Sequence, residues 1–433
     1  MPSSTSPVQR QDHIAWINLI GFIIIGFVFI VFPRATPVLL LALGVAAVFN
    51  NISGKIDVRR WVIFGPIGLT LLAILGYLLI NSAWSLDISA AYHRSILFAI
   101  FGGAALFSIS AVDREKPGAI EPRVWGLLIG VLIGLVYIFM EIITDRAIKI
   151  GLFNMVPSLR PSLKHITVEQ DLVTFIKPAD LNRSLGALIF ILWPCLLIIS
   201  RKLRSPMKWV LAGALLILSA VSIYGSVHAS SKLALPVGIA AFLMAWYAPR
   251  FAYWGIMTAW CASVIFIVPL ALAVYSYGFH QKSWIDPSAV QARIIIWGVT
   301  ARETLKTPIL GVGVRSTRHV SEALGKNQKK LEGEAYKKVT GRHGHNIFVQ
   351  TWYELGAVGA ALLLIFGIGI INLISRLELA YQAYAYATFA SIVTVATFSW
   401  GIWQIWYMAA LAFAPIILAM VLRYSRLKTE PDI

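Results

Sequence analysis

The sequence has little charge and almost no cysteine. Charged residues make up 13% of its 433 residues, whereas 58% are hydrophobic. A soluble domain of this length could not cover so much apolar surface with so few charges, and this excludes a soluble globular protein. The two cysteines, Cys195 and Cys261, both fall inside apolar runs. They therefore indicate neither a disulfide framework nor a cysteine metal site.

Acidic residues are also scarce. The chain has 20 Asp and Glu against 37 Lys and Arg, and its formal net charge is +17. The basic residues lie between apolar runs instead of on one soluble face, so the charge does not indicate a nucleic-acid partner. Membrane lipids or an anionic substrate explain it better.

Apolar runs near the length needed to cross a bilayer, by contrast, recur along the whole sequence. They predict an all-α, polytopic integral membrane protein with about twelve transmembrane helices. The expected spans are residues 14–32, 37–50, 61–81, 95–112, 123–143, 183–200, 208–226, 232–248, 251–278, 346–374, 381–398 and 400–422.

The short loops predict the orientation, because one set of them carries many basic residues. These are Lys55, Arg59, Arg60, Arg201, Lys202, Arg204, Lys208, Arg423, Arg426 and Lys428. The positive-inside rule puts this side, with both termini, in the cytoplasm. We therefore expect helices one to nine in residues 1–278, including a periplasmic loop at about 144–182. A large basic periplasmic loop with short helices follows at 279–344, and three helices with a cytoplasmic tail occupy 345–433.

The loop at 279–344 carries twelve Lys and Arg against five Asp and Glu, an excess of seven positive charges. Long loops are exempt from the positive-inside rule, so this charge needs its own explanation. We expect the loop to handle an anionic ligand. A solvated loop that is weakly attracted to lipid is the simpler alternative.

Within this loop, residues 289–306 have a helical pattern that places Arg293 and Trp297 on one face. Pro308 ends the pattern, and a glycine-punctuated turn follows up to Gly313. The spacing of this turn does not match a dinucleotide or P-loop fingerprint.

Further cations follow this turn or lie where other outward-facing helices begin. Guanidinium groups suit phosphate because they stay charged and can donate two parallel hydrogen bonds. Each cation alone is explained as simply by solvation, by snorkelling or by pairing with an acid. These cations are Arg315 and Arg318 after the turn, Arg183 at the start of span six, Lys232 in the stretch HASSKLALP (residues 228–236), and those of Tyr92-His93-Arg94, which precedes span four.

Two histidines, His343 and His345, stand where the tenth span begins. If the helix includes His345, its face continues through Gly356, Gly359 and Gly367. Glycines on one face would let another backbone approach closely, as small residues do between membrane helices. An ionisable residue at this depth is a functional candidate, and a boundary histidine that caps its own helix is the alternative.

Glu354 follows His345 by nine residues and falls on the opposite side of such a helix, so we do not expect it to orient the histidine. Histidines at i and i+2, such as His343 and His345, point apart on a helix. The outward loops also lack the acidic cluster of a metal site. We therefore expect neither a metal nor another cofactor.

These residues resemble the O-antigen ligase family, which belongs to a superfamily of lipid-linked-glycan ligases and polymerases. His345-Asn346 is followed after nine residues by Gly356 and after two more by Gly359, which is similar to the family's His-Asn signature. The run from Arg293 through Trp297 to the Pro-x-x-Gly-x-Gly turn is similar to another of its elements.

The span count and the single large outward loop match the family as well. The resemblance covers residues 183–375 through these motifs, and the first half of the chain only through its span count. One departure concerns Lys232, because the family usually has an arginine at this place, followed four residues later by a leucine. Lysine keeps the charge but loses the bidentate fork, which weakens the role assigned to it.

The resemblance implies a membrane-embedded glycosyltransferase with a GT-C-like architecture. It implies transfer of a polysaccharide from undecaprenyl pyrophosphate to a sugar hydroxyl of the lipid A-core oligosaccharide, at the periplasmic face of the bacterial inner membrane. A neutral histidine can take the proton of that hydroxyl near pH 7, and fixed cations can stabilise the leaving pyrophosphate without a metal.

We therefore expect His345 as the general base, Arg293 and Lys232 on the pyrophosphate, and inversion at the anomeric carbon. Further phosphate or acceptor contacts are expected from Arg315, Arg342, His343 and Arg183. Alternatives within the superfamily are an O-antigen polymerase and a protein O-oligosaccharyltransferase. A lipid-linked-glycan transporter is a more distant alternative, because no internal repeat is evident and the polar groups gather at one face.

Overall fold

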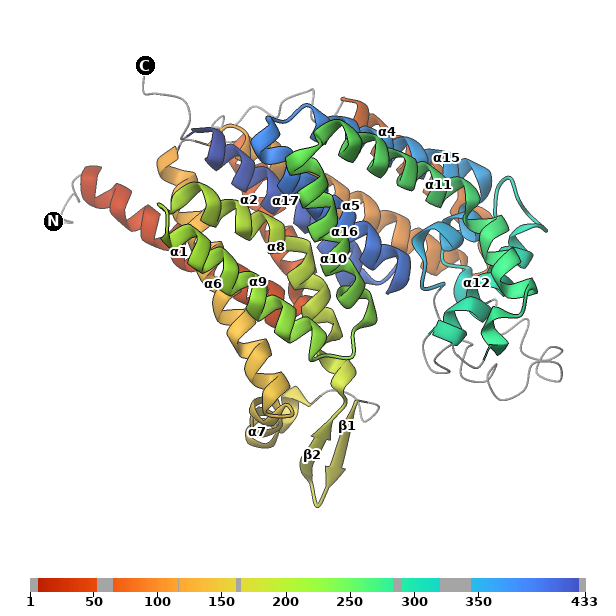
Figure 1. Ribbon diagram of the computed structural model, residues 1–433, viewed down its shortest axis with the longest axis horizontal. Coiled ribbons are helices and arrows are strands. Elements are labelled where there is room, and N and C mark those ends of the chain that lie inside the picture. The colour runs from red at the N-terminus through yellow and green to blue at the C-terminus, as the bar shows by residue number, and fades with distance from the viewer. Residues whose placement is uncertain are drawn as a thin grey trace.

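Long apolar helices run side by side through most of the molecule in the computed structural model (Figure 1). The structure describes residues 7–52, 65–115, 117–160, 165–282, 290–319 and 344–427. Its elements are α1 (Pro7–Val31), α2 (Thr36–Ile52), α4 (Pro66–Asn81), α5 (Ile88–Val112), α6 (Pro117–Ile143), α7 (Ala147–Met155), β1 (Ile166–Glu169), β2 (Leu172–Ile176), α8 (Asn182–Lys202), α9 (Met207–Tyr224), α10 (Ala229–Tyr247), α11 (Pro249–Ser276), α12 (Val290–Thr304), α15 (Ile347–Ser375), α16 (Leu379–Phe398) and α17 (Ile405–Leu427).

Ten helices in the described part of the chain are long and apolar enough to cross a membrane. They confirm the predicted all-α, multi-pass membrane protein. The two other expected spans fall on α2, whose apolar part is short, and on α16, which carries several tyrosines and a glutamine. The helices thus occupy the positions that hydropathy predicted. Part of the third expected span, residues 61–64, lies outside the described residues.

α8 lies at the centre of the bundle, and almost all of its side chains are buried. It packs against α16, α17 and α9, and these helices share one large apolar core with α1, α5 and α6.

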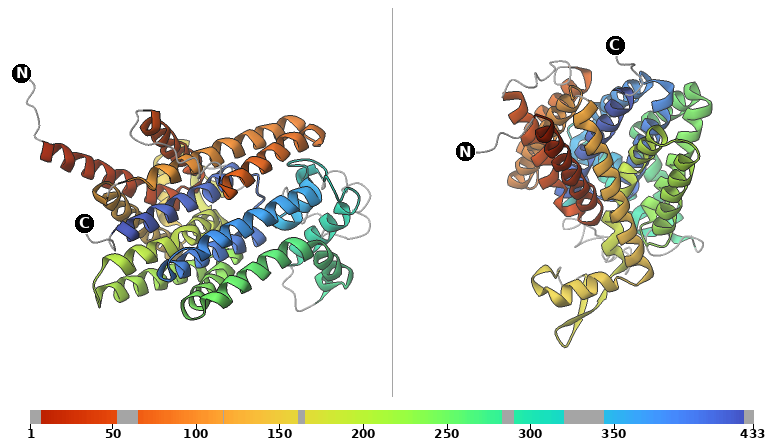
Figure 2. Two further views of the ribbon diagram at one scale, coloured as in Figure 1. Left: turned by 90° about the horizontal axis from the view of Figure 1, so that it is seen from above. Right: turned by 90° about the vertical axis from the view of Figure 1, so that its left-hand side faces the viewer.

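Among the described helices, α1 and α6 pack against each other most extensively (Figure 2). Gly126 and Gly130 of α6 face the backbone of α1, and a Cβ at either position would overlap the carbonyl of Leu19 or Ile23. Small residues allow this close approach of membrane helices, so these glycines set the separation of the pair.

A short two-stranded sheet interrupts the helical pattern and projects from the bundle beside α7 (Figures 1 and 2). β1 and β2 pair antiparallel around Gln170 and Asp171, which both have positive φ. The side chain of Asn154 in α7 holds this hairpin through Val173, with its Oδ1 2.7 Å from the amide and its Nδ2 3.1 Å from the carbonyl. The sequence-based interpretation contained no strand in residues 144–182, because a four-residue strand gives hydropathy no signal.

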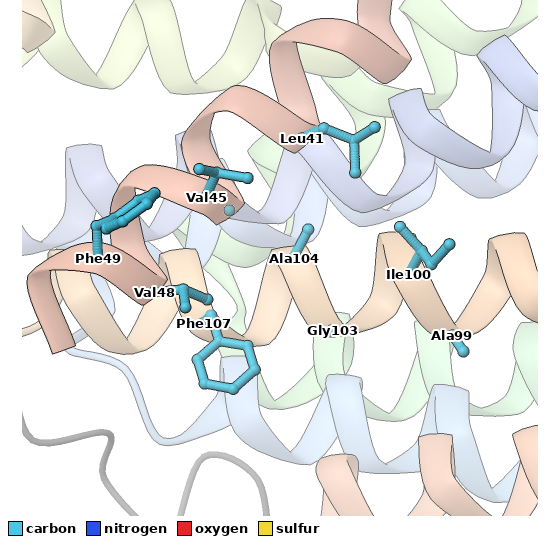
Figure 3. A pocket seen from close by; sticks show the side chains of 10 residues that line it. Leu41, Val45, Val48, Phe49, Ala99, Ile100, Gly103, Ala104 and Phe107 are labelled. Atoms are coloured by element: carbon cyan, nitrogen blue, oxygen red, sulfur yellow. The ribbon is translucent and has the colours of Figure 1, made fainter. Parts of the chain in front are cut away.

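The bundle also has an apolar groove of about 390 Å³ between α2 and α5 (Figure 3). Phe49, Phe107, Leu41 and Ile100 are among its walls. No charged residue lines it, so it lies apart from the polar groups described next.

Candidate functional site

A break in α15 organises the polar end of the molecule. Gly356 has a non-helical backbone with φ of 62° and ψ of −162°. The segment that follows α12 lies against this break, and its main-chain groups form hydrogen bonds with the main-chain groups of α15 on both sides of it. Its hydrogen bonds join Val312 to Tyr353 (3.1 Å), Gly313 to Glu354 (2.9 Å), Ala357 to Pro308 (2.8 Å) and Val358 to Ile309 (3.3 Å).

Glycine is required on both sides of this junction. Gly311 has φ of 69°, and a Cβ there would overlap the backbone of Glu354. A Cβ at Gly356 would overlap the carbonyl of Ile309 in turn. The Pro-x-x-Gly-x-Gly turn and the glycine eleven residues after His345 are therefore two halves of one main-chain junction.

The other glycines of the tenth span have different neighbours. A Cβ at Gly359 would meet the side chain of Leu355, and a Cβ at Gly367 would meet the indole of Trp260. Of the three glycines expected to admit a neighbouring backbone, only Gly356 therefore does so.

Two residues of the first half of the chain also hold this junction. The hydroxyl oxygen of Tyr77 lies within hydrogen-bond distance of two carbonyls, those of Leu310 (3.0 Å) and Leu355 (2.8 Å), which share its single hydrogen. The amide of Asn81 donates to Leu310 as well, at 2.8 Å. Sequence reasoning missed both residues, because a single tyrosine and a single asparagine in an apolar helix carry no motif.

His345 lies before α15 and not on it. Asn346 is the N-cap of the helix, and its Oδ1 accepts hydrogen bonds from the amides of Phe348 (2.9 Å) and Val349 (3.1 Å). His345 itself has φ of 49°, in the left-handed region. The assignment of His345 to a helix face was therefore wrong, because Asn346 is the cap and the helix begins only after it, at Ile347.

The imidazole of His345 is oriented by the main chain at the end of α16. Its Nδ1 lies against the carbonyl oxygen of Ser399. A carbonyl only accepts, so Nδ1 carries the hydrogen and the lone pair stays on Nε2. Burial and, to a lesser extent, the positive charge of Arg293 lower the pKa of His345, although the hydrogen bond to Ser399 opposes them. His345 is therefore a neutral imidazole near pH 7, in the tautomer that accepts a proton at Nε2.

A second histidine, His228, lies on the other side of Ser399. Its Nδ1 is 2.7 Å from the hydroxyl of Ser231 and its Nε2 is 2.9 Å from the hydroxyl of Ser399. The ring stacks on Trp400, with 4.8 Å between centroids. Burial and the charge of Arg293 lower the pKa of His228 to about 3. Sequence reasoning missed this residue, although it begins the quoted stretch HASSKLALP.

Arg293 lies close enough to both histidines that its positive charge disfavours their protonated forms. It lies in the first turn of α12 and is half-buried, and its pKa is lowered by that burial. Four residues later, Trp297 donates from Nε1 to the carbonyl of Gly344, 3.0 Å away. Trp297 of the predicted pair thus contacts the residue that precedes His345, and the charge of Arg293 acts on His345 itself. Arg293 forms no hydrogen bond or ion pair with any described residue.

Lys232 lies in the first turn of α10, next to Ser231. Its carbonyl accepts from the hydroxyl of Tyr224 at 3.2 Å, but its ammonium contacts neither Arg293 nor His345 in the described part of the chain. Neighbouring residues of a helix point about 100° apart, so Lys232 leaves α10 about 100° around the helix from Ser231.

The weaker candidates are spread around this cluster. Arg183 begins α8 and lies 5.8 Å above the ring of Trp406, which is packed edge-on against Trp400. Arg315 forms a 3.4 Å ion pair with Asp87, at a different place. Arg342 and His343 lie outside the described residues.

Glu354 is fully buried and holds three segments together. It accepts from the amide of Thr317 at 3.0 Å and its hydroxyl at 2.6 Å, from Gln350 at 3.1 Å, and from the indole of Trp403. It contacts the segment after α12 and the loop before α17, as well as its own helix. In agreement with the sequence-based expectation, none of these contacts is to His345.

Among the residues that the structure describes, no group of three or more His, Cys, Asp or Glu side chains could hold a metal ion. The charges around His345 come instead from Arg293 and from main-chain dipoles.

The helices and this cluster define a multi-pass membrane protein with a polar site where α10 and α15 begin and α16 ends. A family model described as O-antigen ligase matches residues 214–364, which include His228, Arg293, the break at Gly356 and His345. The match confirms the predicted relationship to the O-antigen ligase family, and with it a general function of the O-antigen ligase or polymerase type. No curated protein matches the chain.

Proposed function

We propose that the protein is an O-antigen ligase that moves a polysaccharide from undecaprenyl pyrophosphate to a sugar hydroxyl of the lipid A-core oligosaccharide. The reaction takes place at the periplasmic face of the bacterial inner membrane. The observation that carries this proposal is the neutral His345, held in one tautomer by Ser399 beside Arg293.

His345 acts as the general base. Its Nε2 takes the proton of the acceptor hydroxyl while the hydroxyl oxygen forms a bond to the anomeric carbon of the donor. The bond from that carbon to the pyrophosphate oxygen breaks, and its electron pair leaves with the pyrophosphate. A hydroxyl is a weak nucleophile, so a base that is neutral near pH 7 lowers the barrier. Direct displacement inverts the anomeric configuration.

Arg293 stabilises the leaving pyrophosphate. Negative charge develops there in the transition state, and a fixed guanidinium without a partner of its own among the described residues is suited to receive it. Lys232 contributes a second charge from the start of α10. Arg183, Arg315, Arg342 and His343 contact phosphates or the acceptor further out. The protein's own cations thereby supply the charge for a metal-independent transfer.

Deletion of the gene tests the choice between ligase and polymerase. In a ligase mutant, finished polymer accumulates on the lipid carrier and the lipid A-core remains bare. If carrier-linked polymer does not form at all, the protein is an O-antigen polymerase. If the core is fully decorated and a periplasmic protein loses its glycan, the protein is a protein O-oligosaccharyltransferase.

A further inference from the structure

Arg94 of α5 carries a charge that no described residue neutralises. Its Nε and Nη1 are buried and have no hydrogen-bond partner. An arginine stays charged at every pH at which proteins fold, and a buried charge without a counter-charge is costly. A residue in this state is suited to a ligand that brings the missing negative charge.

A second guanidinium, that of Arg315, lies beside the start of the same helix α5. The positive charges of Arg315 and Arg94 act on each other. Asp87 is the only described acid beside Arg315, with its Oδ2 3.4 Å from Nη1. Its Oδ1 already accepts from the amide of Ala90 as the cap of α5. The carboxylate of Asp87 therefore pairs with one of the two guanidinium groups only and is partly committed to the helix cap, so two positive charges and one negative charge leave the place with a net positive charge.

The two arginines are held in fixed positions. Arg94 follows Asp87 by seven residues, which is about two turns along one face of α5. The segment with Arg315 is attached to the start of this helix, since the hydroxyl of Ser85 donates to the carbonyl of Val314 at 2.7 Å. The hydroxyl of Ser316 accepts from the amide of Leu86 at 3.2 Å. The site is therefore formed before a ligand arrives, which lowers the cost of binding.

We propose that Arg94 and Arg315 bind a phosphate group of a lipid, at a site separate from that of Arg293. Guanidinium groups bind phosphate with paired, charge-assisted hydrogen bonds, and Arg94 lies in the first two turns of α5. Arg293 exchanges no contact with either arginine in the described part of the chain. The inference rests on the proposed function for Arg315, which is already assigned a phosphate or acceptor contact there, and adds Arg94 as its partner. The phosphate belongs either to lipid A or to a phospholipid of the bilayer.

Purified full-length protein in detergent provides the test. Diphosphorylated lipid A and phosphatidylglycerol are titrated separately, and binding is measured by native mass spectrometry and by the shift of the unfolding temperature. We expect Arg94→Gln and Arg315→Gln each to weaken binding of at least one lipid by about tenfold or more. Arg204→Gln, which removes an exposed arginine between α8 and α9, is the matched control and leaves binding unchanged.

The two lipids separate the sources of the phosphate. Loss for lipid A alone identifies the acceptor lipid, loss for phosphatidylglycerol alone identifies a bilayer phospholipid, and loss for both identifies a general phosphate site. Folded Arg94→Gln and Arg315→Gln proteins that bind both lipids as tightly as the wild type would overturn the inference. Arg315→Gln decides the matter alone if Arg94→Gln does not fold, because Arg315 lies in a loop. His345→Ala should retain this binding, so loss of transfer and loss of phosphate binding are distinct results.

Discussion

Nδ1 of His345 donates to the main-chain carbonyl of Ser399. The hydroxyl of the same serine lies 2.9 Å from Nε2 of His228, so one residue at the end of α16 connects both histidines. A main-chain group fixes the tautomer of the proposed base as firmly as a side chain could, because it cannot rotate away.

The general-base assignment predicts the effect of removing the imidazole. In purified protein with both lipid substrates, His345→Ala should lower the rate of transfer by about 10²–10⁴-fold, because proton removal is lost. Binding of the carrier-linked donor should remain close to that of the wild type. Full transfer activity in the variant would exclude His345 as the base.

Arg293 should affect both binding and turnover. Arg293→Gln removes a charge from the ground state and from the leaving pyrophosphate, so donor affinity and kcat should both fall. Arg293→Lys keeps the charge without the fork and should recover only part of the activity. An unchanged kcat with weaker donor binding would restrict Arg293 to binding alone.

The pH dependence follows from the protonation of His345. Only the neutral imidazole accepts a proton, so kcat/KM should fall as pH decreases through the pKa of His345. Since burial and Arg293 lower that pKa below 6.5, the half-maximal value should lie below pH 6.5. Removing the positive charge in Arg293→Gln raises the pKa of His345, so the profile should move to higher pH. A profile that stays in place in this variant would contradict the interaction.

His228 is predicted to act by positioning Ser399. His228→Asn should lower kcat by up to about 10²-fold with a smaller change in KM, because the base is misplaced while the substrate sites persist. The midpoint of the pH profile should shift as well, a change that simple loss of stability would not cause. Equal changes in kcat and KM with an unmoved profile would argue for a purely structural role.

The junction in α15 predicts a stability effect that is independent of catalysis. Gly356→Ala places a Cβ against the carbonyl of Ile309 at positive φ, and should cost about 1–3 kcal/mol or more of folding stability. Gly76→Ala is the control, because a Cβ at Gly76 of α4 meets nothing within 4 Å. Thermal unfolding in detergent measures both, and equal unfolding temperatures would mean that the break tolerates a side chain.

Much of the fold could be predicted because it depends on local composition. Apolar length alone located the helices, and the spacing around His345 and Arg293 indicated the family. The short hairpin after α7 could not be predicted in this way, because its strands are brief and its turn uses Gln170 and Asp171 instead of glycine.

The site was harder to predict because its contacts join distant parts of the chain. The carbonyl of Ser399 and the rings of His228 and His345 come from three separate segments, and no spacing rule connects them. The same is true of Tyr77 and Asn81 at the glycine junction. Helical periodicity led to the wrong prediction that His345 lies on a helix face, since a helix wheel does not show at which residue a helix begins.

The break at Gly356 has a mechanical consequence. It divides α15 into a short outer piece that begins beside His345 and a longer rod within the bundle, and the amides of Ala357 and Val358 at the junction donate to Pro308 and Ile309 of another segment. The outer piece is joined instead to the turn after α12 and, through Tyr77 and Asn81, to α4. A displacement of the rod therefore acts on the outer piece at a joint that the turn after α12 and α4 also hold, whereas His345 is held separately by Ser399 at the end of α16.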